Sequence, residues 1–319
     1  MTYNEAIKGG VRVVNRNWQL VLIQLSVVFI SSIGFFIIVG IPLAIAFIIF
    51  GVDLTEMADL NDIIKILKGP SDILSKYFGL FLIVLASLLL YLILIALLGI
   101  YVFGGSIGII GRSLRDSSLT FHVRAFFEEA KRLFLRLLAF TSFIGIVFII
   151  VAFVLGILGG GIAALVSYAQ TQDSTLALFI GTFFSLIMII MAAILILGIL
   201  SITLYGIASL SFKETGPVKS IQEAWQFMTR HPDAFWLYTI LFGGYLLASF
   251  LLVLFSYPFA LIPIIGTILS FPYQLISYAF ETYLGLIIIA AMLNFYYSME
   301  IQTVSAEPDA EGPVQQPAE

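Results

Sequence analysis

The chain has 319 residues, of which 61% are hydrophobic and 11% are charged, and its mean hydropathy is +1.10. A soluble domain carries roughly 25% charged residues and could not bury this much apolar surface, so the composition excludes an ordinary soluble enzyme. The absence of cysteine also excludes disulfides, thiolate metal sites and a cysteine nucleophile.

The apolar runs are too long for barrel strands and predict an all-α membrane protein with about six transmembrane helices. The expected spans lie, in chain order, within residues 18–50, 78–110, 137–158, 176–210, 234–257 and 273–298. An interruption is expected near Gly40-Ile41-Pro42, and the third span is expected to end at Gly159-Gly160-Gly161. The apolar stretch 258–272 contains prolines, which predict either a buried loop or a short re-entrant segment.

The sequence predicts a single polytopic membrane domain over residues 1–302 and a disordered tail over 303–319. The tail is acidic, contains prolines and lacks aromatic residues, so ordering it would bury little apolar surface. It also accounts for the formal net charge of −4, which therefore does not indicate a site for a particular partner, and no nucleic-acid partner is expected. The first apolar run is longer than the core of a signal peptide and is interpreted as a retained span.

The basic residues fall on alternate connections between the spans. Most of the 15 Lys and Arg residues lie before the first span, between the second and third, and between the fourth and fifth. By the positive-inside rule, both termini and the two basic connections face the cytoplasm, and the expected location is the cell membrane.

Three basic segments, near residues 2–17, 121–138 and 217–230, carry an apolar stripe with helical spacing. Such helices lie in the headgroup layer of a membrane and present their basic face to anionic lipid. The expected partners are therefore membrane lipids with anionic headgroups on the cytoplasmic face. The residues expected to contact headgroups are Lys8, Arg12, Arg16, Arg124, Lys131, Arg132, Arg136, Lys219 and Arg230.

The three basic segments also align with one another. Each contains Glu-Ala followed six positions later by Arg, and each precedes an odd-numbered span. The aligned residues are Glu5-Ala6 with Arg12, Glu129-Ala130 with Arg136, and Glu223-Ala224 with Arg230. The pattern favours three repeats of an amphipathic helix followed by a helical hairpin, although any basic amphipathic segment before a span would look similar.

Residues 216–225, Gly-Pro-Val-Lys-Ser-Ile-Gln-Glu-Ala-Trp, continue through Arg230 into the fifth span. This stretch resembles one that recurs in YciC-like inner-membrane proteins and in the membrane domain fused to some glycerophosphodiester phosphodiesterases. The resemblance implies a bacterial multi-span inner-membrane protein. It implies no catalytic activity, because the catalytic part of the fused enzymes is a separate soluble barrel.

No metal or cofactor site is expected, because His122 and His231 are the only histidines and stand alone. The segment Gly104-Gly105-Ser106-Ile107-Gly108 lacks the Lys-Ser/Thr of a phosphate-binding loop. Its glycines, with a second pair further along, fit close packing between helices. The packing positions are Gly104, Gly108, Gly156 and Gly160.

Glu281 is the one charged residue inside an expected span, with Gln274 before it and Asn294 further along the same helix. A charge inside the bilayer usually faces a partner or a cavity. Glu281 is therefore either a proton or substrate site or an interfacial structural carboxylate.

Two functions remain open, and an intramembrane enzyme ranks third because no pairing of nucleophile and base is visible. The first is a non-catalytic protein that organises, senses or assists at the bilayer, linked to lipid or envelope handling. The second is a transporter or permease for a small solute or lipid. A polar midplane cavity lined by Gln24, Ser31, Glu281 or Asn294 would favour transport.

Overall fold

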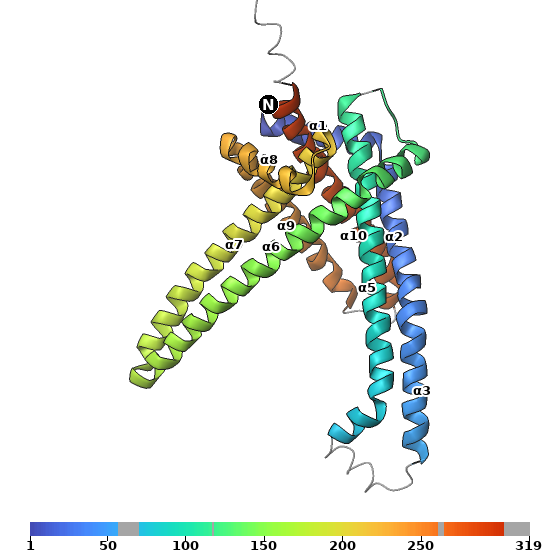
Figure 1. Cartoon of the computed structure of the whole chain (residues 1–319), viewed down its shortest axis with the longest axis vertical. Coiled ribbons are helices and arrows are strands. Elements are labelled where there is room, and N and C mark those ends of the chain that lie inside the picture. Colours follow the sequence, from blue (N-terminus) through green and yellow to red (C-terminus); the bar gives the residue numbers. More distant parts are fainter. Residues whose placement is uncertain (57–69, 117, 261–264, 303–319) are drawn as a thin grey trace, which may run out of the picture. The chain divides into compact units, whose positions relative to one another are not determined.

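The computed structural model describes residues 1–56, 70–116, 118–260 and 265–302, and within these ranges the chain is helical with no strand (Figure 1). The elements are α1 (Tyr3–Arg16), α2 (Gln19–Phe35), η1 (Phe36–Gly40), α3 (Ile41–Glu56), α5 (Pro70–Arg115), α6 (Val123–Gln172), α7 (Ser174–Lys213), α8 (Pro217–Arg230), α9 (Asp233–Ala260), α10 (Ile265–Tyr296) and η2 (Tyr297–Gln302).

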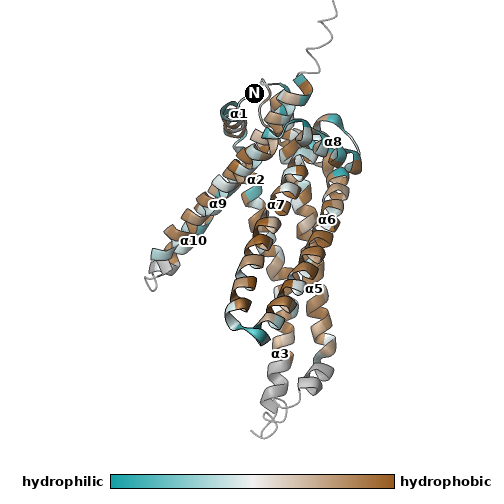
Figure 2. Ribbon diagram, turned by 90° about the vertical axis from the view of Figure 1, so that its left-hand side faces the viewer, coloured by the Kyte–Doolittle hydropathy of each residue, from teal (hydrophilic) through white to brown (hydrophobic). Residues whose placement is uncertain are grey.

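Among the described residues, six helical segments are long and apolar enough to cross a membrane. They are Gln19–Ile49, Tyr77–Arg115, Val123–Gln172, Ser174–Lys213, Asp233–Pro258 and Ile268–Gln302. Hydrophobic residues follow these helices along their length, whereas hydrophilic residues gather at α1, α8 and the turn between α6 and α7 (Figure 2). The prediction of an all-α membrane protein with six spans is confirmed.

The expected interruption of the first span is a π-helical stretch, η1, after which the helix continues as α3. Pro42 has no N–H to donate, which leaves a carbonyl one turn earlier without its usual partner. In η1 the N–H of Ile41 donates to the carbonyl of Phe36, five residues back, and such a π-bulge keeps the backbone hydrogen-bonded inside lipid.

The prediction that the third span ends at Gly159-Gly160-Gly161 is wrong, because α6 continues through the three glycines to Gln172. A glycine costs roughly 1 kcal/mol against alanine in an exposed helix. An unpaired peptide group in hydrocarbon costs several kcal/mol. Because that cost exceeds the glycine penalty, the three glycines stay helical between their apolar flanks.

The stretch 258–272 is also more helical than expected. Pro258 lies within the last turn of α9, and Pro272 lies within α10. Of this stretch, residues 261–264 lie outside the described residues. The tail 303–319, which was predicted to be disordered, also lies outside them.

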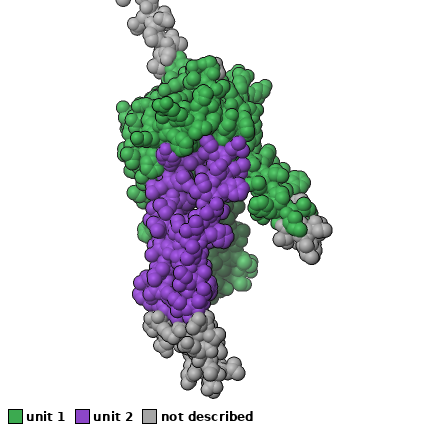
Figure 3. All heavy atoms as spheres, turned by 90° about the vertical axis from the view of Figure 1, so that its right-hand side faces the viewer, with its two compact units in different colours: residues 1–21, 103–319 green, residues 22–102 purple. Residues whose placement is uncertain are grey.

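The chain forms two compact units, residues 22–102 and residues 1–21 with 103–319 (Figure 3). The first unit is the hairpin of the first two spans. The second contains the three amphipathic segments, the other two hairpins and the last turns of α5. The single membrane domain over 1–302 stays a prediction.

Within the second unit, most buried side chains lie where the amphipathic segments meet the last turns of α5, α7 and α10. We call this region the packed layer and define it as residues 1–20, 103–115, 123–140, 205–238 and 286–300. Its centre is aromatic. Phe227 lies 4.9 Å from both Tyr205 and Tyr296, measured between ring centroids.

Candidate functional site

The first amphipathic helix, α1, packs against α10. It begins with a capping box, in which Thr2 accepts from the N–H of Glu5 and the Glu5 carboxylate accepts from the N–H of Thr2. These hydrogen bonds lower the pKa of Glu5. The buried face carries small residues, and at Gly10 a Cβ would lie 2.7 Å from the backbone nitrogen of Ala291, so only glycine permits this approach.

The second amphipathic segment forms the first turns of α6 and packs against the end of α5. Phe126, Ala130 and Leu133 are buried. They cover the glycines in the last turns of α5. A Cβ at Gly105 would lie 2.6 Å from the ring of Phe126, and one at Gly104 would lie 3.5 Å from Cβ of Leu133. Unlike α1, this segment runs into its span without a break.

The third amphipathic helix, α8, packs against the end of α7. Ser220, Ala224 and Phe227 are buried. The Ser220 hydroxyl lies 2.7 Å from that of Thr215, and a Cβ at Gly206 would lie 3.6 Å from the carbonyl oxygen of Ser220. Proline at the first helical position and extended backbone at Gly216 begin the helix.

The apolar stripe of each amphipathic segment is therefore covered largely by protein rather than lipid. The stripe alanines Ala6, Ala130 and Ala224 are completely buried. Large apolar side chains that remain exposed beside these stripes are Val123, Phe127, Leu135, Val218 and Trp225. These side chains, rather than the stripe itself, are available to lipid.

A network of ion pairs crosses the packed layer between α5, α6 and the end of α7. Glu129, whose side chain is 2% exposed, pairs with Arg112 at 2.5 Å and with Arg132 at 2.6 Å. Arg132 also pairs with Glu214 at 2.7 Å, and Arg136 lies 3.5 Å from the same carboxylate. The sequence predicted that Arg132 and Arg136 contact lipid headgroups, and it did not predict that Glu129 pairs with Arg132. The Glu-Ala pattern of the repeats was the available signal, because it places an acid next to the apolar stripe.

A second network joins α7, α8 and η2. Lys213 lies 3.0 Å from Glu300 and 3.8 Å from Glu223. Glu223 also accepts a hydrogen bond from Ser209, and Arg230 lies 3.9 Å from Glu300. Glu129 and Glu223, which align in the sequence, both pair with a basic residue at the end of the preceding span.

Two polar cavities lie within the packed layer. One, of about 240 Å³, is lined by Arg112, Arg115, Glu129 and Arg132, with Gly108 and Gly111 in its wall. Its arginines are occupied, because Arg115 donates to the carbonyl of Phe212 at 2.8 Å and the other two pair with Glu129.

The other cavity is a groove of about 400 Å³ beside α1. Lys8, Arg12 and Arg16 line it from one face of the helix, with Ser113 from α5 and Asn294 from α10. We call it the α1 groove. Its basic residues are spaced four apart, which places them on one side of the helix.

The candidate residues in the last span are not brought together. Glu281 is half-buried and makes no hydrogen bond or ion pair with the described residues, and Gln274 is exposed. Asn294 lies about 20 Å from Glu281 along the helix axis. Its amide lies against α1, where it donates to the carbonyl of Ala6 at 3.5 Å.

Of the four glycines expected at helix contacts, Gly104 and Gly108 lie against α6. A Cβ at Gly156 or Gly160 would have no described atom within 4 Å, whereas a Cβ at Gly159 would lie 2.9 Å from the terminal methyl of Met188. The contacting face of α6 is therefore offset by one residue, which is a rotation of about 100°.

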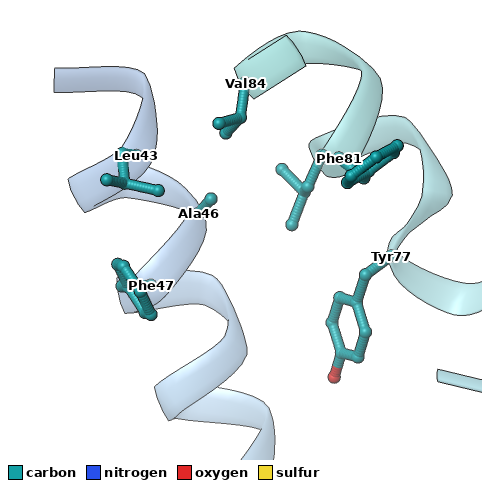
Figure 4. Close-up of a pocket in the computed structure, with 7 residues that line it drawn as sticks. Leu43, Ala46, Phe47, Tyr77, Phe81 and Val84 are labelled. Atoms are coloured by element: carbon teal, nitrogen blue, oxygen red, sulfur yellow. The ribbon is translucent and has the colours of Figure 1, made fainter. Parts of the chain in front are cut away.

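The unit formed by residues 22–102 contains an apolar cavity of about 250 Å³ between α3 and α5 (Figure 4). Its lining is Leu43, Ala46, Phe47, Tyr77, Leu80, Phe81 and Val84. Elsewhere in this unit the hydroxyls of Ser31 and Tyr91 lie 2.7 Å apart. The cavity therefore offers an apolar surface, and no carboxylate or amide stands among its described lining residues.

Within the described ranges, no cluster of His, Asp or Glu side chains could hold a metal ion. Comparison of the chain with protein families, with curated proteins and with solved structures finds no significant match.

Proposed function

We propose that this chain is a non-catalytic inner-membrane protein that organises or assists at the cytoplasmic face of the bilayer by holding anionic lipid. The observation that carries the proposal is the packed layer. It buries the small-residue faces of three amphipathic segments and leaves basic side chains such as Lys8 and Arg12 exposed. A basic layer at the ends of apolar helices suits a protein that gathers anionic headgroups.

The repeat hypothesis is part of this proposal. The segment of each repeat packs on the second span of another: α6 on α5, α8 on α7, and α1 on α10. The three alanines that align in the sequence are all buried in these contacts. The contact of α1 with α10 therefore brings the first segment against the last span.

The proposal also includes the orientation of the chain in the membrane and its resemblance to a family of membrane proteins. The charge distribution favours a cytoplasmic packed layer and cytoplasmic termini. The resemblance of residues 216–230 to YciC-like proteins favours a bacterial inner membrane and a role in lipid or envelope handling.

A transporter or permease is the alternative, and one observation favours it: the half-buried Glu281 has no hydrogen-bond or ion-pair partner among the described residues. However, both polar cavities described above lie in the packed layer, at the helix ends, and the cavity between α3 and α5 is apolar. These placements favour the lipid-organising role.

The native tryptophans provide the test, because Trp18, Trp225 and Trp236 all lie in the packed layer and are 55%, 58% and 58% exposed. The intact protein is reconstituted into mixed vesicles in which either phosphatidylglycerol or phosphatidylcholine carries a bromine quencher on its chains. We expect brominated phosphatidylglycerol to quench at least about 3-fold more effectively at low salt, and the preference to fall in high salt. Equal quenching by the two lipids at low salt would refute the proposal.

A further inference from the structure

We propose that the α1 groove is a specific binding site for a phosphate ester, and that its ligand is the headgroup of an anionic phospholipid. This inference rests on the proposed function and makes it more specific. It locates the general preference for anionic lipid at one site, which binds one chemical group.

The charges of the groove are the first argument. Lys8, Arg12 and Arg16 line it together with one carboxylate, Glu5. Glu5 accepts from the N–H of Thr2 at 2.8 Å within the capping box. Asp116, whose carboxylate interacts electrostatically with Arg16, is likewise held by the N–H and hydroxyl of Ser118 at 2.8 and 2.7 Å. The groove therefore carries a net positive charge.

The contrast with the other two segments is the second argument. In the second segment the residues that align with Lys8 and Arg12 are Arg132, which pairs with Glu129 and Glu214, and Arg136, which lies 3.5 Å from Glu214. In the third, Arg230 aligns with Arg12 and lies 3.9 Å from Glu300. Lys8 and Arg12 form no ion pair within the described part of the chain. An external anion would supply the missing charge.

The shape of the groove is the third argument. Its volume of about 400 Å³ falls within the range of small-ligand sites. Gly9 contributes no side chain, and Asn294 lines the groove with an amide that has a second N–H to donate. Arg16 is anchored by its bond to the carbonyl of Ser113 at 2.7 Å. Arg12 can meet two phosphate oxygens with its planar guanidinium while Lys8 supplies a mobile cation.

The location of the groove identifies the lipid as the source of the phosphate. Trp18, which closely follows α1, is 55% exposed, and exposed tryptophan is typical of the membrane–water interface. A groove at this level meets headgroups at a far higher local concentration than it meets a soluble phosphate ester.

The experiment titrates short-chain phosphatidylglycerol into the full-length protein in a neutral maltoside detergent and counts bound lipid by native mass spectrometry. We expect Lys8→Gln/Arg12→Gln to weaken binding about 30-fold, which corresponds to two lost cation–phosphate contacts. The matched control, Arg124→Gln/Lys131→Gln, removes two exposed charges from α6 and should change binding less than about 2-fold. The exchange Lys8→Arg/Arg12→Lys should retain most of the affinity. Melting temperatures of all variants should agree, because the substituted side chains are exposed.

Equal weakening by the α1 variant and the α6 control, or no weakening by either, would overturn the inference. Competition by millimolar glycerol phosphate would keep the phosphate site but assign it to a soluble ester, and failure to compete would assign it to lipid. If the tryptophan quenching still shows a preference for phosphatidylglycerol while the α1 variant binds normally, the site is refuted and the general function stands. Loss of the quenching preference refutes both.

Discussion

Removing the buried carboxylate of Glu129 should destabilise the packed layer. Its side chain is 2% exposed and holds Arg112 and Arg132, which are 42% and 34% exposed. Breaking a fully buried ion pair costs about 3–5 kcal/mol. Because both arginines reach water, the cost is reduced by solvent screening, and we expect Glu129→Gln to lower the free energy of unfolding by about 2 kcal/mol.

The neighbouring residue offers a matched control. Among the described residues Glu128 pairs with Arg124 alone, and these side chains are 54% and 93% exposed, so Glu128→Gln should change the free energy of unfolding by less than about 0.5 kcal/mol. Both variants would be unfolded by dodecyl sulfate titration in mixed micelles and followed by tryptophan fluorescence. If the two substitutions cost the same within about 0.5 kcal/mol, the ion-pair network contributes no more than a surface pair and the reasoning fails.

Substitutions at Gly10 and Glu281 test the packing and the membrane interior. Gly10→Ala should lower the free energy of unfolding by about 1–3 kcal/mol, because the new methyl would press on the backbone of Ala291. Gly243 faces open space in α9, so Gly243→Ala should be neutral or slightly stabilising in the same titration. If Gly10→Ala and Gly243→Ala had equal effects, α1 would not pack against Ala291 as described. Glu281→Gln should not lower stability and Glu281→Leu should raise it by about 1–2 kcal/mol, since an unpaired carboxylate in a span is costly. A loss above about 1 kcal/mol in both variants would reveal a hydrogen-bond partner for Glu281.

The spans were predictable because an apolar run of about 20 residues has few other solutions in a membrane. Their ends were less predictable. Glycine and proline end helices in water, where exposed peptide groups find partners, but α6 passes through Gly159-Gly160-Gly161 and α9 reaches past Pro258. In lipid the loss of a backbone hydrogen bond outweighs the local propensity.

The amphipathic segments were visible as patterns, but what covers them was not. The stripe containing Ala6 and Gly10 would look the same whether it faced lipid or protein. The size of its residues was the available clue, because small side chains let backbones approach closely. The contact of Gly10 with Ala291 joins opposite ends of the chain, and no local pattern contains that pairing.

The basic residues could be counted from the sequence, but which of them pair with protein carboxylates could not be predicted. Arg132 and Arg12 occupy similar basic faces, yet the structure pairs Arg132 with Glu129 and Glu214, whereas Arg12 lines the α1 groove. Which cations remain for lipid depends on the distances between helices, and these are set by the glycine contacts of the packed layer.

The central claim is that the packed layer lies at the cytoplasmic face of the membrane, and cysteine labelling in intact cells tests it most directly. The chain has no native cysteine, so single cysteines at two exposed positions at opposite ends of spans report cleanly. Thr120 precedes α6 beside the packed layer, and Gln172 ends the same helix. An impermeant maleimide should label Gln172→Cys from outside and should label Thr120→Cys only after the cells are permeabilised. Labelling of Thr120→Cys but not Gln172→Cys in intact cells would contradict the account.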